Sequence, residues 1–96
     1  MAQGDLAGAS RRFTEDLVIA ERLAANDPAN AVWQRDLWVS FVKLANLCED
    51  SHRAEEAQIW WRKAYETLAG MKQRGLHISP QDEAILKQLR AKAGGE

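Results

Sequence analysis

Residues 41–64, FVKLANLCEDSHRAEEAQIWWRKA, carry the pattern that decides the fold. On each side of the polar segment 49–56, aromatic, leucine and alanine residues recur at steps of three and four. Steps of that size place side chains on one face of an α-helix. Small residues at Ala45, Ala57 and Ala64 would let two such faces approach closely. The stretch therefore predicts an antiparallel helical hairpin.

Prolines and glycines divide the rest of the chain into further helices. The expected segments are about 6–26, 31–50 and 52–74, followed by a fourth helix that begins at Pro80 and frays near 93. Gly75 suits the left-handed residue that ends the third helix. Side chains that can accept the free amides of a first turn precede the four segments; they are Asp5, Asn30, Ser51 and Ser79. Asp82 is expected to reach back to the amide of Ser79.

Each expected helix has one apolar stripe. The first stripe comprises Leu6, Ala9, Phe13, Leu17, Ala20 and Ala24. The second comprises Trp33, Leu37, Phe41, Leu44 or Ala45, and Cys48. The third comprises Ala54, Ala57, Trp61, Ala64, Leu68 and Met71, and the fourth helix carries Ala84, Ile85, Leu86 and Leu89. Trp38 lies beside its stripe and is expected to be half covered, and Trp60 is expected against the fourth helix or at the surface.

The composition sets the class of protein. The chain has 96 residues, 46% of them hydrophobic and 28% charged, with a formal net charge of −1. That length suits one domain, and the near-zero charge provides no basic field for nucleic acid or for an anionic membrane. No apolar run is long enough to cross a bilayer. Without an export signal, and with a single cysteine, the expected location is the cytoplasm.

Residue types that carry catalysis or metal binding are sparse and isolated. His52 and His77 have no second ligand at metal-site spacing. Cys48 falls on a packing position, where a free cysteine is commonly buried. Neighbouring acids such as Glu55 and Glu56 point about 100° apart on a helix and cannot flank one bond. The sequence predicts no catalytic, cofactor or metal site.

The hairpin resembles the tetratricopeptide repeat (TPR) family. Seven residues fall on that family's positions, with alanine, cysteine and tryptophan in place of its glycine, tyrosine and phenylalanine; they are Phe41, Leu44, Ala45, Cys48, Ala57, Trp61 and Ala64. Segment 9–17 also aligns with 57–65, an offset longer than the usual repeat. The resemblance implies an all-α, right-handed solenoid fragment from the C-terminal part of a long-helix array, of a kind found in bacterial signalling proteins. Its parts would be a half repeat (4–30), a full hairpin (31–75) and a capping helix (79–93).

The resemblance implies a protein–protein interaction scaffold without catalysis. Its partner would be another protein or peptide, and the groove side chains would come from the second helix: Val39, Val42, Lys43, Asn46 and Glu49. A second hypothesis is a homodimer that completes its own solenoid. It would form through the stripe of the first helix, namely Leu6, Ala9, Phe13, Leu17 and Ala20. A third hypothesis is a small enzyme that depends on Cys48.

Overall fold

The computed structural model describes the backbone of residues 2–94 and the side chains of 11–12 and 14–94. It contains four helices: α1 (Ala2–Asn26), α2 (Ala31–Asp50), α3 (Ala54–Gln73) and α4 (Pro80–Lys92). No strand occurs in the described backbone. The predicted all-α class is therefore confirmed, and the expected order of helices is present.

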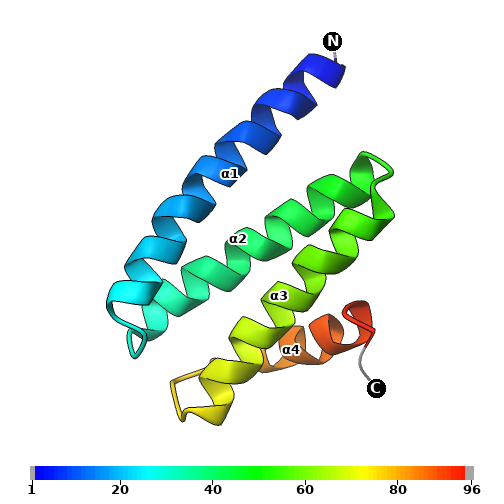
Figure 1. The fold of residues 1–96 in the computed structure, drawn as a ribbon. Coiled ribbons are helices and arrows are strands. Elements are labelled where there is room, and N and C mark those ends of the chain that lie inside the picture. The colour runs from blue at the N-terminus through cyan, green and yellow to red at the C-terminus, as the bar shows by residue number, and fades with distance from the viewer. Residues whose placement is uncertain (1, 95–96) are drawn as a thin grey trace.

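Each helix packs against its neighbours in sequence. Within the described chain, backbone contacts join α1 to α2, α2 to α3 and α3 to α4, and no other pair of helices. Figure 1 shows successive helices running in opposite directions, with the N-terminal half of α1 diverging from α2. The overall dimensions are 44 × 31 × 19 Å. The molecule is thus a flat assembly, in which α1 is covered along one side only.

The core is centred between α2 and α3. Ala45, Ala57 and Ala64 are almost completely buried, which lets the two backbones approach. The predicted stripe of α3 is confirmed from Ala57 to Met71, whereas Ala54, at the first position of the helix, is exposed. Around these small residues lie the larger buried side chains: Leu17, Trp38, Phe41, Leu44, Trp61, Leu68, Met71 and Leu89.

The tryptophans differ from their predicted burial. Trp38 is only 2% exposed, so the expectation of a half-covered side chain is wrong. Trp33 and Leu37 are instead partly buried. Trp60 is also partly buried, and it stacks on Phe41 with ring centroids 5.9 Å apart. A helix with neighbours on two sides buries a wider face than one stripe, and this brings Trp38 into the core.

Two of the four predicted N-caps are confirmed. The Asn30 side chain accepts a hydrogen bond from the amide of Trp33 at 3.2 Å. Ser79 accepts one from the amide of Asp82 at 3.1 Å, with Pro80 at the start of α4. Asp5 lies inside α1 rather than before it, so that N-cap was predicted wrongly.

Ser51, predicted as the N-cap of α3, instead ends α2. Its hydroxyl donates to the carbonyl of Leu47 at 2.9 Å, and α3 begins three residues later. The amide of Arg53 donates to the carbonyl of Cys48 at 2.8 Å, and the amide of His52 donates to that of Glu49 at 3.1 Å. This paired closure is a Schellman motif, and it puts His52 in the left-handed region, at φ 61°.

The same closure ends α3 with the residue that suits it. Gly75 has φ 78°, and its amide donates to the carbonyl of Lys72 at 3.1 Å. The next amide, of Leu76, donates to Met71 at 2.9 Å. The predicted glycine cap is confirmed.

Candidate partner-binding surface

The five side chains predicted to line a groove do not form one open surface. Val39 and Val42 are partly buried and pack against the core. Glu49 accepts a hydrogen bond from Trp61 Nε1 at 2.8 Å and lies 3.7 Å from the ammonium group of Lys92. Lys43 and Asn46 are exposed. Of the five, only these last two present exposed side chains without a hydrogen bond or ion pair among the described residues.

The residues predicted for self-association fall into two groups, those buried in the fold and those whose side chains lie outside the described residues. Leu17 and Ala20 are buried against the chain's own helices. Leu17 is therefore unavailable to a second copy while this fold persists, whereas Ala20 also lines an open cavity between α1 and α2. Leu6, Ala9 and Phe13 lie outside the residues whose side chains the structure describes.

The structure shows a different open apolar surface, a groove between α1 and α2. Its walls include Ile19 and Leu23, which are 57% and 37% exposed, and the partly buried Trp33. The cavity is about 210 Å³. The complete lining, which we call the α1–α2 groove, is Asp16, Ile19, Ala20, Leu23, Trp33, Asp36 and Ser40.

The groove exists because α1 has more apolar residues than one neighbour can cover. Leu17, Val18 and Ile19 are consecutive, and successive side chains on a helix point about 100° apart. Leu17 faces the core, so Val18 and Ile19 remain exposed. The consecutive apolar residues 17–19 are therefore the signal in the sequence that could have predicted this surface.

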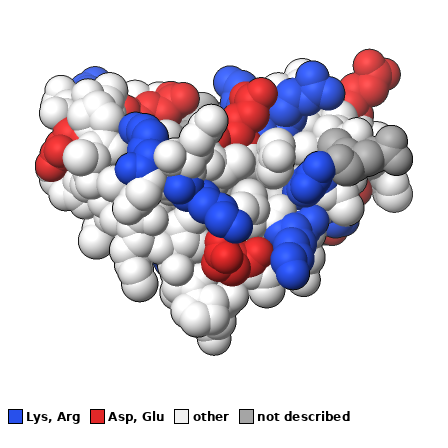
Figure 2. Space-filling model, turned by 90° about the horizontal axis from the view of Figure 1, so that it is seen from below, with Lys and Arg blue, Asp and Glu red and all other residues white. Residues whose placement is uncertain are grey.

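The charges of the groove are acidic and unpaired. Asp16 on α1 and Asp36 on α2 are both exposed, and neither carboxylate has an ion pair among the described residues. On the face shown in Figure 2, by contrast, basic and acidic side chains are mixed across a largely uncharged area.

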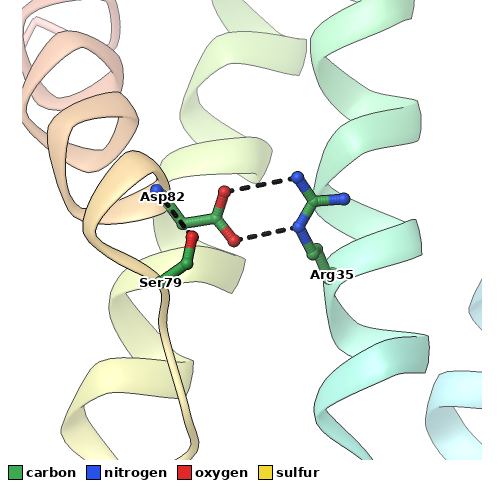
Figure 3. Close-up of polar contacts among 3 residues, drawn as sticks. All are labelled: Arg35, Ser79 and Asp82. Carbon is green, nitrogen blue, oxygen red and sulfur yellow. Dashed lines mark hydrogen bonds and ion pairs between the residues drawn. The ribbon is translucent and has the colours of Figure 1, made fainter.

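On the other side of α2, an ion pair fastens α4 to the hairpin (Figure 3). Arg35 Nε lies 2.9 Å from Asp82 Oδ2, and Nη2 lies 3.3 Å from Oδ1. This hydrogen bonding raises the pKa of the Arg35 guanidinium. The expected return of the Asp82 side chain to its own cap is therefore wrong, because the carboxylate is used between helices.

Trp38 completes that contact. The guanidinium carbon of Arg35 lies 5.5 Å from the centroid of its ring, a cation–π distance. The indole Nε1 of Trp38 is buried without a hydrogen-bond partner. The shape of the ring therefore matters more here than its polar atom.

The chemistry of Cys48 is that of a packing residue. Burial and the nearby Glu56 carboxylate raise the pKa of its thiol, and Sγ lies 3.9 Å from Glu56 Oε2. A raised pKa lowers the fraction of the side chain present as thiolate, which is the reactive form. Among the described residues, no three potential metal ligands come together.

A second cavity, of about 410 Å³, lies where α2, α3 and α4 meet. Two of its lining residues, Glu49 and Lys92, face each other, and Lys92 also lies 5.0 Å from the ring of Trp61. The charged groups of Glu49 and Lys92 already have partners on other helices. In the α1–α2 groove, by contrast, Asp16 and Asp36 have no ion pair among the described residues.

No known protein family, curated protein or solved structure matches the chain. None of the helices in the described region combines the length and the apolar character needed to span a bilayer. The α1–α2 groove is the open surface that was not predicted from the sequence.

Proposed function

We propose that this chain is a protein–protein interaction module built from TPR-like helical hairpins and that it performs no catalysis. The observation that carries the proposal is the α1–α2 groove. Ile19 and Leu23 are large, exposed and adjacent on one helix face, and Trp33 stands opposite them. Clustered exposed apolar side chains of this kind mark interaction surfaces.

The packing of the helices supports the same proposal. In repeat arrays each repeat contacts its neighbouring repeats, and the array presents an extended surface for binding; here backbone contacts join each helix to its neighbours in sequence, and side-chain ion pairs also join α2 to α4. In this reading α1 is a half repeat, α2 and α3 form one repeat, and α4 is the cap. The exposed residues of α4 are mostly polar, which suits a terminal repeat; they include Gln81, Lys87, Gln88 and Arg90.

The test compares two changes of equal chemistry at different places. Ile19→Glu adds a charge inside the groove, and Ile59→Glu adds one on α3, where the side chain is 55% exposed. Proteins enriched from a lysate by the wild-type chain are identified, purified and measured by calorimetry. We expect Ile19→Glu to weaken the purified complex at least tenfold and Ile59→Glu to leave it unchanged.

Both variants should retain the helical circular dichroism of the wild type, because both side chains are exposed. Equal affinity of the two variants for every purified partner would contradict the proposed role of the groove.

A second candidate, the homodimer, is favoured by the concentration of exposed apolar side chains near α1. Val18, Ile19, Leu23 and Val32 account for most of the large exposed ones in the described chain. Sedimentation equilibrium at ~100 μM tests it. A dimer that becomes a monomer on Ile19→Glu would support this candidate, and a monomeric wild type would exclude it at that concentration.

A further inference from the structure

We propose that the α1–α2 groove takes a segment of another polypeptide that presents an arginine or lysine beside an apolar side chain. This inference rests on the proposed interaction function and specifies the chemistry of the partner.

The size of the groove favours a peptide. Sites for small molecules are typically about 300–1,000 Å³, and this cavity is smaller, at about 210 Å³. It suits one or two side chains that project from a larger partner. Ile19, Leu23 and Trp33 would cover the apolar part of that partner.

The carboxylates specify the charge of the partner. Asp16 and Asp36 stand on different helices around the same cavity, and neither forms an ion pair among the described residues. A cation placed between them would gain both attractions at once, beside apolar side chains that lower the local dielectric. An anionic segment or an anionic lipid surface would be repelled.

The protein already uses this arrangement internally. Arg35 lies between the carboxylate of Asp82 and the ring of Trp38. The groove offers the same two components, carboxylate and tryptophan, without the cation. Trp33 can contribute a cation–π contact as Trp38 does. We infer that a partner's arginine or lysine supplies the missing group.

The experiment uses the full chain and a phage-displayed library of random dodecapeptides. Selected peptides are synthesised and titrated by calorimetry and by NMR, with the indole N–H of Trp33 as the reporter. The test variant is Asp16→Asn with Asp36→Asn. The control variant is Asp50→Asn with Glu66→Gln, which changes the net charge equally at exposed positions away from the groove.

The expected result has three parts. Peptides that shift the Trp33 signal carry arginine or lysine next to an apolar residue. They bind the test variant about tenfold more weakly than the wild type, as two partly exposed ion pairs would require, and the control variant as tightly as the wild type. Raising the salt to 0.5 M weakens binding further, because screening acts on such pairs.

The other outcomes are distinguishable. Peptides that shift Trp33 but need no cation, and bind both variants equally, would overturn this inference and leave the interaction function standing. Failure of every peptide to shift Trp33 would overturn both. If the groove is instead filled by a second copy of the chain, the Trp33 signal will depend on protein concentration, and the proposal of a separate partner is wrong.

Discussion

The two residues of the Arg35–Asp82 ion pair should differ in how much the protein is destabilised when each is replaced by alanine. The Asp82 side chain is only 5% exposed, and that of Arg35 is 51% exposed. Removing the arginine leaves a nearly buried carboxylate without its partner, whereas removing the aspartate leaves a guanidinium that can turn into water. We therefore expect Arg35→Ala to destabilise the protein more than Asp82→Ala.

The magnitude lies between two known limits. Removing one partner from a fully buried pair costs about 3–5 kcal/mol, and exposed pairs contribute about 0.2–1 kcal/mol. Half exposure of Arg35 places the coupling energy at about 1–2 kcal/mol. Loss of the contact with Trp38 adds about 0.5–1 kcal/mol to the cost of Arg35→Ala, which totals about 1.5–3 kcal/mol.

The assay is urea unfolding followed by circular dichroism, on both single variants and the double variant. The pair Lys72–Glu83 is the matched control, because it also joins α4 to the hairpin, at 3.1 Å, but has side chains 59% and 43% exposed. Its coupling energy should stay below about 0.5 kcal/mol. Equal coupling energies for the two pairs would refute the argument from burial.

Further predictions concern the core, a helix end and the cysteine. Trp61→Ala should lower the free energy of unfolding by about 3–5 kcal/mol, and Trp60→Ala by clearly less, because the Trp61 ring is buried and the Trp60 ring only partly so. Urea unfolding measures both; a larger loss for Trp60→Ala than for Trp61→Ala would contradict the packing of α3. Trp38→Phe should be tolerated better than Trp38→Ala by at least about 2 kcal/mol, since it keeps an aromatic ring and removes an unpaired buried N–H; equal losses would contradict the argument that packing of the ring dominates. His52→Gly should stabilise the protein by about 0.5–1 kcal/mol, because glycine adopts positive φ without steric cost, and a lower melting temperature would count against this. The raised pKa of Cys48 keeps the thiol protonated, so a thiol reagent at pH 8 should react at least tenfold faster in urea than in the folded state; rapid labelling of the folded chain would revive a chemical role.

Local signals in the sequence were sufficient for most helix ends. Asn30, Ser79 and Gly75 act through hydrogen bonds to residues three to five positions away, and such bonds form wherever the chain is helical. The stripe of α3 was equally predictable, since helical periodicity fixes which side chains share a face. Ser51 shows the limit of this reasoning, because the same residue could end one helix or begin the next.

Tertiary structure decided the rest. Asp82 had a local partner available, yet its carboxylate binds Arg35, 47 residues away. The groove around Ile19 and Trp33 likewise depends on where α1 crosses α2. By itself, the sequence determined four helices and the buried face of α3, because those properties depend on neighbours within a turn or two. The packing of the helices decided which of their remaining faces are buried and which stay exposed, because those contacts join residues that are far apart in the sequence.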